Sequence, residues 1–364
     1  MSRVLVVDRE PPQATRDGGA ARMVAVLRLL CEDGHDVTFT SLRPWACASD
    51  RTAQRLVRLG VRIAGIGVAE LLDADPPRVL IASRLAVAEA VGPLARQRSP
   101  AIRFVYDATH VEHLANYRWA KVTGNRPLLA AALRNRTAER DVVAGADAVI
   151  AASDEDACEL RRLDPAVGVH VVTAVHADGD RTDLAPATRT GIVFLGYLGM
   201  PENEMAVRRL VDRVWPLVEA EFGPTPLTVI GAAPPRWLLA AAAHRPTLTV
   251  AGHLHDVDGP LRRAAVLVVP LSGGAGVKTK VLHAFSRHLP VVATTDGLRG
   301  TGAVDGVHAL RAETDEELAA ATVALLRDPA TASGLAHSAA ALLREKFSDA
   351  VNRAALCAAV GCHG

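Results

Sequence analysis

The stretch VLVVPLSGGAGVKTKVLHAFSRHLPVVAT, residues 266–294, decides the fold class. Its pattern predicts a buried strand at 266–269, a glycine-rich loop, a helix at 278–287 and a second strand at 291–294. A helix between two buried strands is typical of parallel pairing, because parallel strands need a crossover connection. The segment therefore predicts an α/β fold in which helices cover a parallel sheet.

The same alternation of short apolar runs and helix-period segments continues on both sides of this stretch. Further strands are expected at Val4–Val7, Asp36–Thr40, Val61–Gly65, Val79–Ala82, Ile102–Tyr106, Ala148–Ala151, Val169–Thr173, Ile192–Leu195, Leu227–Ile230 and Leu248–Ala251. Further helices are expected at Gly19–Cys31, Glu202–Glu221, Pro235–Ala243, Asp256–Arg263 and Glu316–Arg327. We therefore predict two doubly wound, Rossmann-like parallel sheets.

A polar stretch at 177–190, rich in Asp, Arg and Thr, interrupts this alternation. For a chain of 364 residues, a prior of about 150 residues per domain also favours two domains. We expect a first domain over residues 1–180, a linker at 181–190 and a second domain over 191–346. Ligands of doubly wound sheets bind beyond the carboxyl ends of the strands, so the candidate residues should lie in the loops there.

The composition excludes several classes of protein. Hydrophobic residues make up 49% and the net charge is +1, which excludes a mainly disordered chain and a chain-wide nucleic-acid surface. The 5 cysteines show no metal-ligand spacing, so we expect no metal site. Their odd number and wide scatter argue against a disulfide framework, so we expect a reducing, cytoplasmic location. No apolar run approaches the ~18 residues that a membrane span needs, so no transmembrane segment is expected.

Two glycine-rich loops carry features of anion sites. Lys278 and Lys280 open the helix at 278–287, where positive charge is unfavourable unless an anion binds there. Together with the glycines they suit a diphosphate, although the residue order is not that of a Walker A loop, and a solvent-facing helix start is the alternative. Near the N-terminus, the sequence RDGG at 16–19 either offers amides to an anion or forms a tight loop capped by Asp17. The GxGxxG fingerprint is absent there, which disfavours a hydride-transferring enzyme.

The segment 273–294 is similar to the donor-binding segment of retaining GT-B glycosyltransferases, the group 1 or GT4 family. Three more segments of the second half resemble that family, namely VFLGYLGMPENEM at 193–205, TVIGAAP at 228–234 and VAGHLHDV at 250–257. The first half agrees more loosely, through DGGAAR at 17–22 and GHDVT at 34–38. The resemblance covers nearly the whole chain.

The resemblance implies the GT-B fold, with two domains facing a central cleft, and a nucleotide-diphosphate sugar as donor. Lys278 and Lys280 would neutralise the leaving diphosphate, without metal or other cofactor. The other donor-binding residues that it implies are Gly18, Gly19, Gly196, Gly231, His253, Leu254, Gly274, Gly276 and His283. It also implies a C-terminal helix at 347–362 that packs back on the first domain. His253 and His255 form an HxH pair, but no third metal ligand is apparent.

His283 departs from the family, whose ribose-binding glutamate occupies this position. Neutral imidazole accepts one hydrogen bond, whereas a carboxylate accepts them from both ribose hydroxyls. Either the ribose is held differently, or the site is weak, or His283 is a helix residue that contacts no ligand. This departure supports an alternative function, a catalytically lapsed GT-B protein that binds a nucleotide sugar or a partner enzyme.

The segment YDATHVEH at 106–113 resembles the family's Asp-x-His-Asn-x-Glu, which faces the donor sugar and the acceptor. Asp107 and Glu112 match that pattern, whereas Thr109 and His110 do not. We expect His110 to be a catalytic contact to the sugar. The residues expected on the acceptor side are Asp17, Asp107, Glu112 and His113. The alternative is that neither histidine touches a ligand.

A basic stretch between 118 and 140 carries Arg118, Lys121, Arg126, Arg134, Arg136 and Arg140. It is either a solvated face, which is the favoured interpretation, or a surface for anionic lipid or a phosphorylated acceptor. The helix is not clearly membrane-amphipathic, so peripheral membrane contact is not the expected role. The resulting prediction is a hexosyl-transferring enzyme that acts on a small-molecule acceptor, with tailoring of a secondary metabolite suggested by analogy. Another GT-B chemistry, such as that of an epimerase or phosphorylase, is less compatible with the GVKTK loop.

Overall fold

The computed structural model describes residues 2–12, 18–43, 51–173, 189–254 and 256–361. The chain divides into two compact units. The first groups Met1–Val175, Ala275–Val277 and Asp349–Gly364, and the second groups His176–Gly274 and Lys278–Ser348. Most of the expected linker, residues 181–188, lies outside the described residues.

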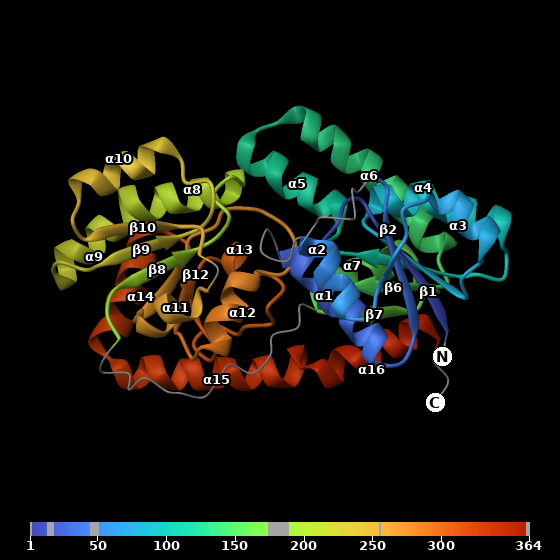
Figure 1. Cartoon of the computed structure of the whole chain (residues 1–364). Helices are drawn as coiled ribbons and strands as arrows, with labels where there is room; N and C mark the ends of the chain where they lie inside the picture. Colours follow the sequence, from blue (N-terminus) through green and yellow to red (C-terminus); the bar gives the residue numbers. More distant parts are fainter. Residues whose placement is uncertain (1, 13–17, 44–50, 174–188, 255, 362–364) are drawn as a thin grey trace. The chain divides into compact units, whose positions relative to one another are not determined.

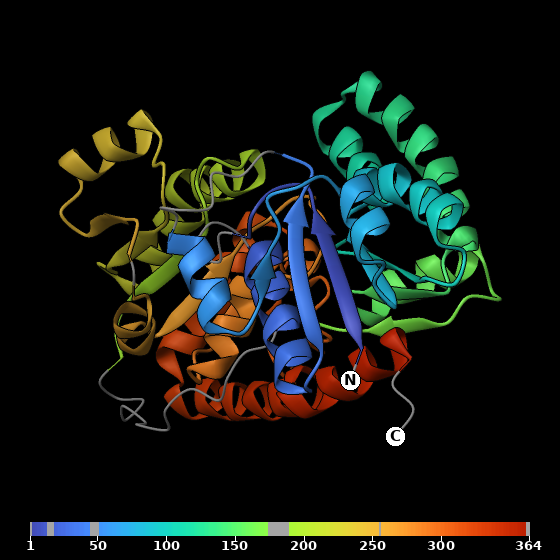
Figure 2. The same ribbon diagram turned by 45° about the vertical axis from the view of Figure 1, so that its right-hand side comes forward.

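The first unit contains a seven-stranded sheet in the order β3-β2-β1-β4-β5-β6-β7. All of its pairings are parallel. Figure 2 shows β1 and β2, in blue, side by side and pointing the same way. The strands are β1 (Arg3–Asp8), β2 (Asp36–Ser41), β3 (Arg62–Ile63), β4 (Val79–Ser83), β5 (Arg103–Ala108), β6 (Ala148–Ala151) and β7 (Val169–Val171). Their aliphatic side chains are buried on both faces, as a parallel sheet covered by helices requires.

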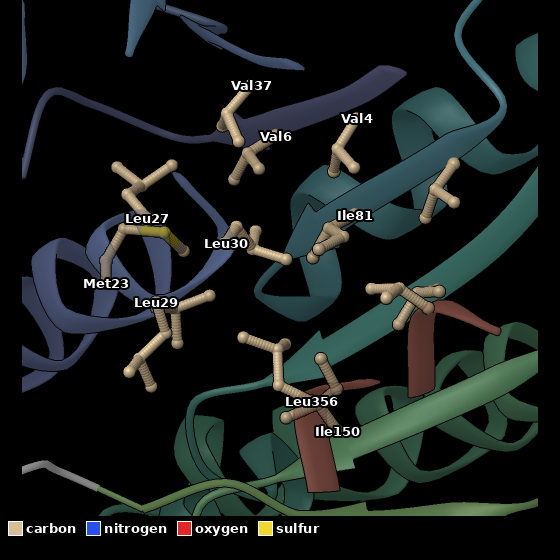
Figure 3. Packing of buried hydrophobic residues seen from close by; sticks show 14 of the residues in the cluster. Val4, Val6, Met23, Leu27, Leu29, Leu30, Val37, Ile81, Ile150 and Leu356 are labelled. Carbon is tan, nitrogen blue, oxygen red and sulfur yellow. The ribbon is translucent and has the colours of Figure 1, made fainter. Parts of the chain in front are cut away.

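Helices cover both faces of this sheet. They are α1 (Gly18–Glu32), α2 (Arg51–Arg58), α3 (Val68–Ala74), α4 (Leu85–Arg98), α5 (Glu112–Thr123), α6 (Arg126–Gly145), α7 (Asp154–Leu163) and α16 (Asp349–Val360). On one face, Met23, Leu27 and Leu30 of α1 recur at helical spacing and belong to the same core as Val6 of β1 (Figure 3). Leu356 of α16 completes this core, which joins the end of the chain to its beginning.

The second unit contains a six-stranded sheet, again with all-parallel pairings, in the order β10-β9-β8-β11-β12-β13 (Figure 1). The strands are β8 (Ile192–Leu195), β9 (Leu227–Ile230), β10 (Leu248–Gly252), β11 (Val266–Val269), β12 (Val291–Ala293) and β13 (Leu310–Arg311). The helices are α8 (Pro201–Arg209), α9 (Trp215–Phe222), α10 (Arg236–His244), α11 (Asp258–Arg263), α12 (Thr279–Ser286), α13 (Thr295–Leu298), α14 (Asp315–Arg327) and α15 (Pro329–Phe347). The prediction of two doubly wound parallel sheets is confirmed.

Three local predictions need correction. The helix expected at 202–221 is interrupted by a π-helical turn, Leu210–Val214, between α8 and α9. The helix expected at 347–362 begins only at Asp349, because α15 ends at Phe347 and Ser348 separates the two helices. The two-residue strand β13 was not expected, since a run this short carries no periodic signal.

The strand order reverses between β1 and β4 in the first sheet and between β8 and β11 in the second. Loops leaving neighbouring strands at such a switch point diverge to opposite faces and open a crevice. The glycine-rich loop follows β11 directly, so it lies at the switch point of the second sheet.

Among the described helices, none is both long and apolar enough to cross a membrane.

Candidate functional site

Lys280, in the first turn of α12, reaches Gly196 in the loop that follows β8 and Asn203 in the first turn of α8. Its Nζ donates a hydrogen bond to Oδ1 of Asn203 over 2.5 Å and lies 4.7 Å from the ring centroid of Phe194. Asn203 in turn donates from Nδ2 to the carbonyl of Tyr197 over 2.8 Å. The amide therefore fixes the ammonium group at the switch point between β8 and β11, and it does so without neutralising the charge.

Two ammonium groups share this edge of the sheet. Burial, followed by the nearby charge of Lys278, lowers the pKa of Lys280 to about 7, and Glu202 opposes this shift only in part. Among the described residues, no carboxylate forms an ion pair with Lys280. Lys278 is buried and occupies the N-cap position of α12, where the helix dipole also disfavours positive charge. The arrangement is electrostatically suited to a bound anion with several negative oxygens.

Glycines allow the surrounding loops to approach one another. A Cβ on Gly196 would lie 2.7 Å from Nζ of Lys280, and one on Gly231 would lie 1.8 Å from the carbonyl oxygen of Gly196. Gly274 has φ +98, and a Cβ there would come 3.4 Å from Nζ of Lys278. Gly276, with φ +65, falls among the residues grouped with the first unit. The glycines thus keep the two lysines close to the backbone.

The Gly231→Ala variant is expected to lose about 1–3 kcal/mol of unfolding free energy, because its methyl group overlaps rigid backbone rather than a movable side chain. Chemical denaturation measures this loss. Gly334→Ala is the control, since Gly334 lies within α15 and a Cβ there meets nothing within 4 Å. The control should gain about 0.5–1 kcal/mol. Equal stabilities of the two variants would contradict the close approach of the loops.

Asp296 holds the glycine-rich loop in shape. Its Oδ2 accepts a hydrogen bond from the amide of Gly273 over 2.6 Å, and its Oδ1 pairs with Arg299 over 2.8 Å. Burial raises the pKa of Asp296, but the hydrogen bonds from Arg299 and from Gly273 outweigh it, so the net pKa is lowered. Asp296 therefore remains charged. No local pattern singles out Asp296 for this role, because Gly273 lies 23 positions away in the chain.

His283 lies on α12 one turn after Lys280. Burial, followed by the charge of Arg287, lowers its pKa, so the imidazole is neutral at pH 7. Asp258 opposes this effect and pairs with Arg287 over 2.5 Å. His283 is thus a neutral group on the helix that Lys278 precedes as N-cap.

The loop after β10 carries two more of the predicted donor residues. His253 is exposed and Leu254 is half-buried. His255, the second histidine of the HxH pair, lies outside the described residues. In the described ranges, no group of three or more potential metal-ligating side chains comes together.

In the first unit, Asp107 is buried at the end of β5 and forms an internal ion pair. Its two oxygens accept hydrogen bonds from Arg22 of α1 over 2.8 and 3.1 Å, and Ser83 donates to it over 2.9 Å. Arg22 also donates to the carbonyl of Val172 over 2.7 Å. This position, 1% exposed, favours a role in fixing the strand ends. Gly18 and Gly19 open α1, whereas Asp17 lies outside the described residues.

His110 and Glu112 form a partly exposed pair after β5. Nε2 of His110 lies 2.8 Å from Oε2 of Glu112, and Nδ1 lies 3.3 Å from the hydroxyl of Thr109. The hydrogen bond to His110 lowers the pKa of Glu112. The side chain of His110 is 28% exposed, so a ligand can reach it.

His113, in contrast, is buried among protein partners. Its Nδ1 lies 2.6 Å from Glu139 and its Nε2 lies 3.3 Å from Glu159. Glu139 is fully buried and also accepts hydrogen bonds from the amides of Glu112 and His113 and from the hydroxyl of Tyr106. No local pattern singles out Glu139, yet this carboxylate fixes the start of α5.

Comparisons with known proteins agree with this architecture. Residues 189–328 match the family model described as glycosyl transferases group 1. HepE from Anabaena, solved in complex with UDP, is 13% identical with a TM-score of 0.69 over 97% of this chain and 98% of that chain. Sucrose-phosphate synthase from Thermosynechococcus elongatus is 15% identical with a TM-score of 0.71 over 96% of both chains. WaaG, a glycosyltransferase involved in lipopolysaccharide biosynthesis, is 14% identical with a TM-score of 0.67 over 98% of this chain and 100% of that chain.

A comparison with the sequences of curated proteins found no match. At these low identities the structural similarities establish the shared fold, and the family model identifies the domain that contains the lysine loop. Residues 189–328 therefore match a group 1 glycosyltransferase domain, and the whole chain shares the two-domain GT-B fold of these solved structures.

Proposed function

We propose that the chain transfers a sugar from a nucleoside diphosphate sugar, and that the second unit holds the diphosphate at the switch point between β8 and β11. The observation that carries this proposal is the pair Lys278 and Lys280 beside the glycine-rich loop, with Lys280 fixed by the neutral side chain of Asn203. The structures of HepE, one with UDP and another with UDP-glucose, support a ligand of this class.

The two ammonium groups act on the leaving group. When the bond between the anomeric carbon and the diphosphate oxygen breaks, its electron pair stays on the diphosphate. Fixed positive charges that face this oxygen stabilise the transition state more than the ground state. This role does not require a metal ion, and we propose that the transfer is metal-independent and retaining, as in the family that the sequence resembles.

In the first unit we propose His110 as the contact to the transferred sugar, because it is partly exposed and is oriented by Glu112. Glu112 is the proposed contact on the acceptor side. Asp107 and His113 are proposed to position this loop rather than to bind ligand directly, since both are buried and bonded to protein groups. The proposed acceptor is a small molecule.

The proposal is tested with a panel of uridine, guanosine, thymidine and adenosine diphosphate sugars. We expect slow hydrolysis of one donor, which releases its nucleoside diphosphate. The rate of this hydrolysis should not fall when EDTA is added. Binding of a donor without any turnover, even with a broad set of acceptors, would instead support the catalytically lapsed alternative. Loss of turnover in EDTA would contradict metal independence.

The affinity for nucleoside diphosphate is expected to fall as the pH rises above 7. Lys280 loses its proton as the pH rises through about 7. The charge of Lys278 lowers this pKa, and the charge of Glu202 raises it. The phosphate pKa is near 6, so the ligand is fully charged above pH 7. The pH dependence of the affinity in this range therefore comes from Lys280. The affinity should fall by up to about tenfold per pH unit. Calorimetry in buffers of different ionisation enthalpy should show proton uptake on binding, and a flat profile without uptake would contradict this role of Lys280.

The His283→Glu variant is expected to bind the nucleoside diphosphate about tenfold more tightly, because a carboxylate accepts hydrogen bonds from both ribose hydroxyls. Arg287, which also acts on His283, would stabilise the new charge. Calorimetry with the nucleoside diphosphate and with inorganic diphosphate separates ribose contacts from phosphate contacts. Weaker binding of the nucleotide alone would show that the histidine has a specific partner of its own.

A further inference from the structure

A helical hairpin in the first unit carries a surface that the proposed donor site does not use. Helices α5 and α6 lie side by side and are joined by Gly124 and Asn125 (Figures 1 and 2). Gly124 takes φ +68, and Asn125 caps α6 by accepting a hydrogen bond from the amide of Leu128. These features fix the turn, so the hairpin is a built element of the fold.

Large apolar side chains are exposed on this hairpin. Leu133 is 68% exposed and Leu129 is 43% exposed, both on α6, and Tyr117 and Val122 of α5 are exposed as well. Ala132, Glu139 and Val143 form the buried face of α6, which packs into the first unit. The exposed leucines are therefore not part of the core of that unit.

Arginines flank these leucines on the same face. Positions 126, 129, 133, 136 and 140 recur every three or four residues, so one helix face presents arginine, leucine, leucine, arginine and arginine. All five residues are exposed. Arg140 also pairs with Asp141, so the remaining charge is concentrated towards the turn.

The hairpin is also free of acidic residues over residues 114–138, a stretch that contains five basic ones. They are Arg118, Lys121, Arg126, Arg134 and Arg136. Arg118 pairs with Glu155, and Lys121 lies 5.4 Å from the ring centroid of Tyr117. The three arginines of α6 in this stretch are exposed. The acidic residues of the two helices lie outside the stretch, where Glu139 is buried against His113 and Asp141 pairs with Arg140.

We propose that this hairpin binds the surface of a lipid bilayer that contains anionic headgroups. Leu129 and Leu133 enter the boundary between headgroups and acyl chains, and Arg126, Arg134 and Arg136 contact the lipid phosphates. A helix that lies in the membrane interface buries exposed aliphatic side chains at the boundary between headgroups and acyl chains, while its basic side chains are attracted to anionic lipids. Each basic residue near an anionic surface adds to the attraction.

The charge pattern disfavours two other occupants. A second copy of the chain, docked on this face about a two-fold axis, would place arginines against arginines. A nucleic acid would contact the arginines through its phosphates, but the leucines between them would gain nothing from a polyphosphate surface. A bilayer satisfies both kinds of side chain at once.

The experiment is sedimentation of the full chain with vesicles of phosphatidylcholine alone and of phosphatidylcholine mixed with phosphatidylglycerol. Binding to the mixed vesicles should be at least about tenfold tighter and should weaken as salt is added. The double variant Leu129→Ser with Leu133→Ser should lose most of this binding, as should Arg126→Gln with Arg136→Gln. These side chains are exposed, so the variants should keep the thermal stability and the nucleotide affinity of the parent chain.

Matched controls use exposed residues outside the hairpin. Leu239→Ser on α10 removes a leucine that is 48% exposed, and Arg55→Gln with Arg58→Gln on α2 removes two exposed arginines. Both controls should bind the mixed vesicles like the parent chain. Absence of binding to anionic vesicles would overturn the proposal. So would loss of binding in the arginine variant but not in the leucine variant, together with equal binding to heparin, since that result indicates a general polyanion surface.

Discussion

Replacing Lys280 by Ala is expected to lower the turnover number by about 10²–10³-fold, the loss seen when one donor to a developing oxyanion is removed. Lys280 is fixed against the loop after β8 by Asn203, so its ammonium group is in place before the leaving diphosphate develops charge. A preorganised charge of this kind costs no reorganisation at the moment of reaction. Steady-state kinetics with the donor that the panel of nucleoside diphosphate sugars identifies measures the effect.

Lys280→Met is the matched control for packing. It keeps an unbranched apolar side chain against Phe194 but removes the charge, so it should be as inactive as the alanine variant while retaining more stability. Thermal unfolding of both variants shows whether the fold is intact. Unchanged turnover in either folded variant would contradict the proposed diphosphate site.

The Asn203→Asp variant is expected to weaken nucleoside diphosphate binding by about 10–100-fold, the range of a charge-assisted hydrogen bond. The new carboxylate would lie where the amide oxygen now accepts the hydrogen bond from Lys280, and would compete with the ligand for that charge. It would also raise the pKa of Lys280 by stabilising the ammonium form, so the fall in affinity with pH should begin above 7.

Asn203→Ala separates charge from positioning in this prediction. It removes the hydrogen bond to Lys280 without adding a carboxylate, so its loss of affinity should be smaller and its pH profile should not move upwards. Calorimetric titrations at several pH values compare the three proteins. Equal affinities of the aspartate variant and the parent chain would show that the neutral partner of Lys280 is unimportant.

The features that the sequence could predict are those encoded locally. Buried β-branched runs mark the strands, and the glycines and lysines of the loop after β11 are contiguous, so both were found from the pattern. The start of the last helix was also encoded locally, because Ser348 before Asp349 is a typical helix cap, but the continuous apolar periodicity concealed it.

The features that the sequence could not predict depend on residues distant in the chain. Asn203 meets Lys280 across 77 positions, and Asp107 meets Arg22 across 85. Both Asn203 and Arg22 stand in segments that resemble the family, but no local pattern assigns their partners. The same holds for Glu139, whose burial against α5 follows only from the packing of the two helices.

The most direct test of the central claim is a calorimetric and thermal-shift titration with UDP, GDP, TDP, ADP and CMP, using the parent chain and Lys280→Met in parallel. A ligand at ~100 times its dissociation constant stabilises the native state by ~2.7 kcal/mol, which a thermal shift resolves easily. We predict selective stabilisation of the parent chain by one nucleoside diphosphate, and a loss of that stabilisation in Lys280→Met. Stabilisation by none of these ligands, or equal stabilisation of both proteins, would contradict a diphosphate site at Lys280.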